Sequence, residues 1–211
     1  MRMAACICML VAASAVVHGE EVYLGVGTTG WVVGGTHSFD FPAALRIEAN
    51  GLDYSRSVDT TDINYDGKLK LVGGSLLFDV FPLGQSSFRL TGGIVVSNNR
   101  ITAVAVPRNG TFTINGQTVP ATGESITFTA RQPKVQPYLG LGFGHTRSKG
   151  WGFFFDLGAT YGNPKVDLTA TPGLVLAVGQ ANVDAEKQSV QDKADKFRFY
   201  PVVKLGWSYT F

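Results

Sequence analysis

The last fifteen residues of the chain alternate strictly between two kinds of side chain. One face of this segment carries only apolar and aromatic residues, namely Phe197, Phe199, Pro201, Val203, Leu205, Trp207, Tyr209 and Phe211. The other face is mixed and includes Arg198 and Lys204. Strands of soluble proteins have about 5–6 residues, whereas a tilted strand that crosses a bilayer needs about 9–11 residues and some overhang. This length and the aromatic end favour a strand that crosses a membrane.

The same period of two recurs in three earlier segments, at 88–97, 135–144 and 151–161. In each segment one face suits lipid, while the other is polar, charged or glycine. Water cannot satisfy backbone groups inside a bilayer, so strands persist there only in a closed barrel. After the first twenty residues no apolar stretch is long enough for a spanning helix. We therefore predict an all-β fold, a transmembrane antiparallel up-and-down β-barrel with long extracellular loops.

The connections between segments predict the orientation and number of strands. Short links at 81–87 and 146–150 alternate with long ones at 98–126 and 162–196, and short turns on the periplasmic side are typical of such barrels. Counting back from a periplasmic carboxyl terminus gives eight strands, with a tight turn at 28–30 joining the first two. Their expected positions are 21–28, 30–37, 42–56, 63–80, 88–106, 126–145, 151–171 and 197–211.

The two long loops contain signals of their own. Asn115-Gly116 lies between β-prone residues, which strongly indicates a hairpin with a two-residue turn. Residues 182–196 are polar and rich in helix formers, with a sparse apolar stripe. Such a stripe is compatible with a short helix or with a disordered charged loop.

Residues 1–19 have the pattern of a secretory signal peptide. A basic start is followed by an apolar run with small residues over 4–17, and cleavage is expected after Gly19. The run is short for a transmembrane anchor. Both cysteines, Cys6 and Cys8, lie within it, so the mature chain would have neither a disulfide nor a thiolate metal site. We expect a signal peptide at 1–19, Sec-type export, and a barrel domain at 20–211.

Four blocks of sequence carry a resemblance to a known family: INYDGKLKL (63–71), PYLGLGFG (137–144), KGWGF (149–153) and FYPVV (199–203). With them the chain resembles a poorly characterised family of small proteobacterial outer-membrane barrels, and more broadly the eight-stranded barrels of the OmpA, OmpX and OmpW types. The resemblance covers the mature chain and implies outer-membrane location but no reaction. Proteins of this class usually end in an aromatic residue with another two residues before it, which the barrel-assembly machinery reads. Phe211 and Tyr209 match that assembly signal.

Candidate catalytic and cofactor motifs are weak. Residues 25–30 match a dinucleotide fingerprint, but a strand follows them where the fingerprint requires a helix. His37 and His145 map to periplasmic strand ends, lack a Ser or Cys partner, and do not form a metal site by themselves. The near-neutral charge of +2 does not favour nucleic acid. We expect neither an enzyme nor a cofactor.

Charged residues on the predicted polar faces suggest a network inside the barrel: Arg46, Glu48, Lys68, Lys70, Arg89, Asp156, Arg198 and Lys204. Side chains fill an eight-stranded barrel, and unpaired buried charges are costly, so these groups should pair and plug the interior. The alternative is a narrow, anion-leaning conduit, because bases outnumber acids six to two in this set. A second set is expected to form an aromatic girdle and the assembly signal: Trp151, Phe153, Trp207, Tyr209 and Phe211.

These expectations lead to three candidate functions. The first is a barrel with a filled lumen that acts in envelope integrity or surface interaction through its extracellular loops. The second is a narrow channel for small solutes or hydrophobic compounds, as in OmpW-type barrels, and the third is a lipid-modifying outer-membrane enzyme. The expected partners are outer-membrane lipids, including lipopolysaccharide, and the barrel-assembly machinery during insertion.

Overall fold

A computed structural model describes residues 20–60, 62–83, 87–145 and 149–211; the predicted signal peptide at 1–19 lies outside these residues. The described chain forms thirteen strands and two helices. Their bounds are β1 Glu20–Gly27, β2 Gly30–Ser38, β3 Ala43–Asp59, β4 Ile63–Val80, β5 Arg89–Ser97, β6 Arg100–Pro107, β7 Thr111–Ile114, β8 Gln117–Pro120, β9 Ile126–Arg131, β10 Val135–Phe143, β11 Gly150–Tyr161, β12 Lys165–Ala170, α1 Pro172–Val178, α2 Gln180–Ala194 and β13 Phe199–Thr210.

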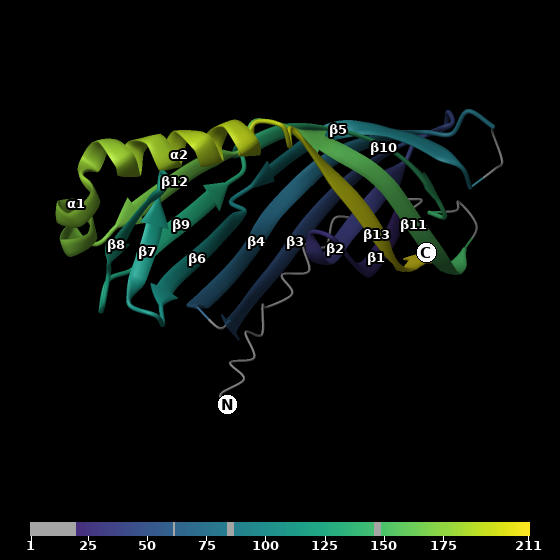
Figure 1. Ribbon diagram of the computed structural model, residues 1–211. Coiled ribbons are helices and arrows are strands. Elements are labelled where there is room, and N and C mark those ends of the chain that lie inside the picture. The colour runs from purple at the N-terminus through teal and green to yellow at the C-terminus, as the bar shows by residue number, and fades with distance from the viewer. Residues whose placement is uncertain (1–19, 61, 84–86, 146–148) are drawn as a thin grey trace.

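Eleven of the strands form one large antiparallel sheet. Its order is β12-β9-β6-β4-β3-β2-β1-β13-β11-β10-β5, and β5 also pairs with β4, so the sheet returns on itself (Figure 1). The tight turn predicted between the first two strands is confirmed, because β1 and β2 pair up to Gly27 and Gly30.

The two faces of this curled sheet differ in the way the alternation predicts. Side chains on the outer face, such as Ile47, Leu76 and Leu139, are apolar and exposed. Side chains on the inner face, such as Arg46 and Asp156, are charged and fully buried. A soluble protein buries its apolar side chains and exposes its charges, so this sheet has the inverse arrangement.

Three of the eight expected strands are each broken in two. Residues 88–106 form β5 and β6, residues 126–145 form β9 and β10, and residues 151–171 form β11 and β12. Proline explains two of the breaks, because Pro133 and Pro164 have no N–H for the strand ladder. At the first break the side chain of Asn99 accepts the hydrogen bond from the N–H of Val72, at 3.1 Å, which a strand carbonyl would otherwise receive.

No residue is inserted at the first break, so the faces of β5 continue into β6. Gly73 pairs with Ser97 and Lys70 pairs with Arg100, three positions along on both strands. The break between β10 and β9 also keeps its register, since Val135 pairs with Val96 and Arg131 pairs with Arg100. The outer face of β4 is therefore continuous with the outer faces of β5 and β6, which pair with it, and of β10 and β9, which pair with β5 and β6.

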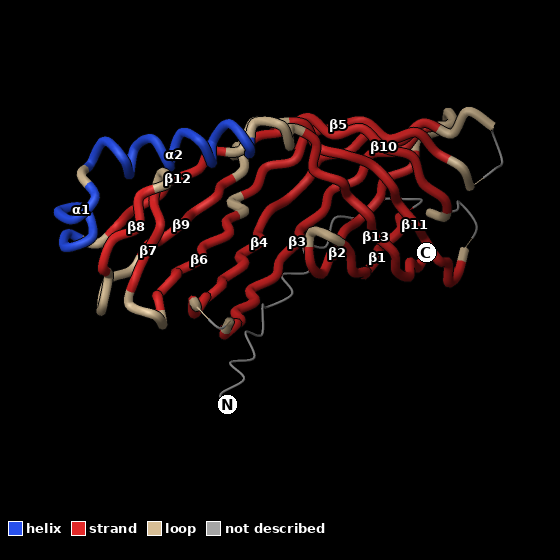
Figure 2. The backbone as a smooth tube through the Cα atoms, in the orientation of Figure 1, coloured by secondary structure: helices blue, strands red, loops and turns tan. Residues whose placement is uncertain are grey.

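Beyond these breaks the sheet continues as a separate region, here called the lobe. It consists of the first half of β4 with its partners in β3, and of β6, β9, β12, the β7–β8 hairpin, α1 and α2. Figure 2 shows both helices gathered at this end of the molecule. The predicted hairpin is confirmed: Asn115 and Gly116 have φ of 47° and 77°, the positive values that a two-residue hairpin turn requires.

A small apolar core holds the lobe together. Its buried members come from the hairpin, the segment after it and the two helices: Phe112, Ile114, Ala121, Leu174, Val178 and Val183. They pack on the inner face of the lobe sheet, against residues such as Ile126 and Leu168. For residues 182–196 the sequence allows a short helix or a disordered charged loop. The structure has the helix: α2 spans Gln180–Ala194.

Candidate functional site

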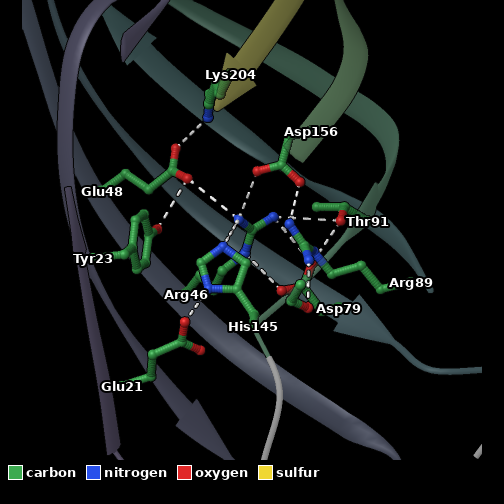
Figure 3. A network of polar contacts seen from close by, with 11 residues as sticks. Glu21, Tyr23, Arg46, Glu48, Asp79, Arg89, Thr91, His145, Asp156 and Lys204 are labelled. Atoms are coloured by element: carbon green, nitrogen blue, oxygen red, sulfur yellow. Dashed lines mark hydrogen bonds and ion pairs between the residues drawn. The ribbon is translucent and has the colours of Figure 1, made fainter. Parts of the chain in front are cut away.

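A network of charged side chains occupies the space that the curled sheet encloses (Figure 3). Its members project from β1, β3, β4, β5, β11 and β13 and from the residues after β10. None is more than 4% exposed: Glu21, Arg46, Glu48, Asp79, Arg89, His145, Asp156 and Lys204. Below, these eight residues are called the inner network.

Arg46 is the hub of the inner network. Its Nε lies 2.6 Å from Asp79 Oδ2 on the neighbouring strand, and its Nη1 donates to Asp156 Oδ2 at 3.0 Å. Nη1 also lies 3.5 Å from Glu48 Oε1 on its own strand. The planar, permanently charged guanidinium can donate in several directions at once. One side chain therefore ties β3 to β4 and β11 across the interior.

Four further contacts, two to Glu48 and two from Arg89, complete the network across the interior. Lys204 on β13 donates to Glu48 Oε2, while Tyr23 on β1 donates to Glu48 Oε1 at 2.9 Å. Arg89 on β5 donates through Nη2 to Asp156 Oδ1 and through Nη1 to the carbonyl of Gly144 at 2.9 Å. Every charged group in these contacts has a partner of opposite sign, as a buried charge requires.

His145 closes the network at the end opposite the lobe. Its Nδ1 lies 2.7 Å from Glu21 Oε1, and its Nε2 lies 3.4 Å from Arg46 Nη1. Arginine has donors only, so Nε2 must accept and Nδ1 must carry the proton that points at Glu21. A neutral imidazole satisfies both contacts, because it has one ring nitrogen that accepts and one that donates.

Of the eight charged residues predicted to lie inside the barrel, five belong to the inner network and three do not. Arg46, Glu48, Arg89, Asp156 and Lys204 come together, as described. The other three are exposed: Lys68, Lys70 and Arg198.

The expectation that these three residues project into the interior was wrong. Lys68 and Lys70 share the outer face of β4 with Leu76, and Arg198 precedes β13 and donates to the carbonyl of Asp195. The polar face of a strand indicates the barrel interior only where the opposite face contacts lipid. Residues 63–70 belong to the lobe, where this condition does not hold.

Sequence reasoning also missed Glu21 on β1 and Asp79 on β4, and the same error explains the omission of Asp79. Placing Lys68 and Lys70 inside assigned the even-numbered residues of β4 to the interior, which put Asp79 outside. Counted from the structure, the inner network holds three permanent cations against four carboxylic acids. The predicted excess of inward bases, six to two, was also wrong, and with it the reason to expect an anion-leaning conduit is removed.

A small cavity lies beside the network. The cavity on its lobe side measures about 20 Å³ and is lined by polar residues such as Asn50, Gln136 and Thr160. This is room for about one water molecule. Within the described ranges, no group of three or more His, Cys, Asp or Glu side chains is placed to hold a metal ion.

The predicted aromatic residues lie together on the outer face, at the end of the sheet away from the lobe. Trp151 and Phe153 on β11 pair in register with Tyr209 and Trp207 on β13. The ring centroids of Trp151 and Tyr209 are 5.3 Å apart, and those of Tyr209 and Phe211 are 5.1 Å apart. Trp151 is 80% exposed. No helix in the described part of the chain is both long and apolar enough to cross a membrane.

Comparisons with known proteins support the fold. The chain is similar to the crystal structure of CarO from Acinetobacter baumannii, with a TM-score of 0.63 and 24% identity over 90% of this chain and 97% of that one. It is also similar to CarO2 of the same organism, with a TM-score of 0.65 and 24% identity over 91% and 98% of the two chains. No protein-family model matches the sequence, and no curated protein matches it.

Proposed function

We propose that this protein is an outer-membrane β-barrel with a closed interior, which presents its lobe at the bacterial cell surface. The pairings support eight spanning strands, because they run from β4 through β5, β10, β11, β13, β1, β2 and β3 back to β4. The exposed apolar outer face supports a lipid environment, since lipid-facing and interior residues alternate in such strands. An even strand number is also usual for bacterial barrels.

The inner network is the observation that carries the proposal of a closed interior. Arg46, Arg89, Asp79 and Asp156 have no exposed surface, and their contacts join opposite walls. Ions would have to pass through a set of paired charges, and the cavity on the lobe side of this set is about the size of one water molecule. We therefore favour a non-enzymatic protein that supports the envelope or binds at the surface over one that conducts solutes.

The lobe supports the surface role. It has its own apolar core, and β3 and β4 extend from the barrel into it (Figure 1). Residues on loops and insertions held by a rigid scaffold commonly carry binding functions. The opposite end carries the exposed aromatic residues and Phe211, which fits a periplasmic end read by the barrel-assembly machinery.

Planar-bilayer recordings test the closed interior. We expect no single-channel steps from the wild-type protein. A variant with Arg46, Asp156 and Lys204 all changed to serine should conduct, provided that its mobility still changes on boiling as a folded barrel's does. The Lys70→Ser variant is the matched control on the outer face and should stay silent. Reproducible steps in the wild-type protein that the triple change abolishes would support the narrow channel instead.

Cysteine labelling tests the orientation. Thr118 on β8 and Asp40 between β2 and β3 are both exposed but lie at opposite ends. In intact cells a membrane-impermeant maleimide should label Thr118→Cys, while Asp40→Cys should react only after lysis. The reverse pattern would place the lobe in the periplasm.

A further inference from the structure

Four basic side chains form a row across four neighbouring strands of the lobe. Lys70 on β4 pairs in register with Arg100 on β6, Arg100 with Arg131 on β9, and Arg131 with Lys165 on β12. Residues directly opposite each other in antiparallel strands project from the same face, with Cβ atoms about 4.5–5.5 Å apart. All four are exposed. They are called the basic row below.

The basic row lies on the outer face, directly beyond the exposed apolar band. Lys70 is two residues from Val72, and Arg131 is four residues from Val135, which are 43% and 61% exposed. At about 3.3 Å per residue, the row stands roughly 7–13 Å from these valines. On the lobe side of a lipid-facing band, this is the level of the outer-leaflet headgroups.

The row is short of negative partners. Like charges directly opposite each other in a sheet destabilise it. Arg131 has Asp167 at 3.5 Å, but Asp167 also pairs with Lys187 of α2 at 3.2 Å. At the other end of the row, Asp53 on β3 pairs in register with Lys70 on β4, and its Oδ1 lies 3.8 Å from Lys68 Nζ.

Among the described residues, Asp53 and Asp167 are the two carboxylates that form ion pairs with the row or with Lys68 and Lys187, which together make six cations. These acidic partners are about half exposed, so water weakens their attraction. The surface therefore keeps a net positive charge that a polyanionic ligand could neutralise. Guanidinium groups bind phosphate oxygens well because they can donate two parallel hydrogen bonds.

We propose that the basic row binds the phosphate groups of a phosphorylated glycolipid in the outer leaflet, while the acyl chains of that lipid lie on the apolar band beside Val72 and Val135. This inference rests on the proposed outer-membrane location and names one partner at it. The position of the row beside the apolar band favours a lipid over a soluble anion, because only a lipid presents phosphates and acyl chains at adjacent levels.

Binding to detergent micelles doped with diphosphorylated lipid A tests the proposal, using the folded full-length mature protein. A variant with Lys70, Arg100, Arg131 and Lys165 all changed to glutamine should bind at least about tenfold more weakly, since each basic residue near an anionic surface adds to the attraction. A variant with an equal charge change elsewhere should bind like wild type. Its four sites are exposed cations of the lobe outside the row: Arg56, Arg108, Lys193 and Lys196.

Three outcomes overturn the proposal. They are unchanged binding by the row variant, an equal loss in the control variant, and equal wild-type binding to dephosphorylated lipid A. Inorganic pyrophosphate separates the two sources of phosphate: binding as tight as that of the lipid would favour a soluble anion and sink the lipid assignment. The outer-membrane proposal is judged separately, by the shift in mobility on boiling and by surface labelling of Thr118→Cys.

Discussion

Arg89 reaches Asp156 over the backbone of Gly142. Arg89 lies on β5 and Asp156 on β11, and Gly142 on β10, the strand between them, pairs in register with both. A Cβ atom at Gly142 would lie 2.3 Å from Asp156 Oδ1 and 2.8 Å from Arg89 Nη2. The ion pair therefore depends on a residue without a side chain in the middle strand.

The Gly142→Ala variant should be less stable by about 1–3 kcal/mol, the usual cost of forcing extra atoms into a packed interior. The measurement is urea unfolding in lipid vesicles, followed by tryptophan fluorescence. Gly92→Ala is the matched control, because its added Cβ would meet only Leu139 Cδ2, at an ordinary 3.6 Å. Equal stability of the two variants would contradict the packing described here.

Removing both partners of the ion pair should cost less than the sum of the two single removals. Arg89→Met leaves Asp156 with Arg46 as its remaining cation, and Asp156→Leu leaves Arg89 facing only Asp79 at 3.7 Å. Losing one member of a buried pair costs about 3–5 kcal/mol. In a double-mutant cycle of unfolding free energies, the double variant should lose clearly less than the sum of the single losses. Simple additivity would show that the two groups do not interact.

Two lysines that the alternation pattern treats alike should behave differently. Lys204→Met leaves Glu48 without its nearest cation in a buried site and should destabilise the protein by about 3–5 kcal/mol. Lys70→Met changes an exposed residue on the outer face and should change stability by no more than about 0.5 kcal/mol. The temperature at which boiling begins to change gel mobility reports both effects.

Phe211 should matter for assembly in the cell and little for the finished fold. It follows the last residue of β13 and is 59% exposed. Phe211→Ala should lower the fraction of protein that reaches the boiling-sensitive, inserted form, while the inserted fraction unfolds as wild type does. Phe197→Ala removes an aromatic side chain that is 75% exposed just before β13, and this variant should assemble normally. Equal assembly of both variants would remove the terminal aromatic residue as a signal.

The sequence by itself determined which residues share a face of each strand, because neighbouring side chains in a strand project to opposite sides. From this period it predicted the large antiparallel sheet and five members of the inner network. From the residues between strands it predicted the turn at 28–30 and the hairpin at Asn115-Gly116. It also predicted the aromatic residues that gather around Trp151 and Trp207. Each of these features depends on residues that are close together in one strand or turn.

Only the tertiary structure decided which face of β4 is enclosed. Both faces of a strand repeat every two residues, so alternation alone does not show which face is enclosed. β4 also continues from the barrel into the lobe, where Lys68 and Lys70 lie on the outer face. Pairing with β3 and β5 places Asp79 beside Arg46, and pairing with β6 places Lys70 beside Arg100. The pairing of the inner network, and the alignment of the basic row across four strands, depend on contacts between distant parts of the chain that no single strand encodes.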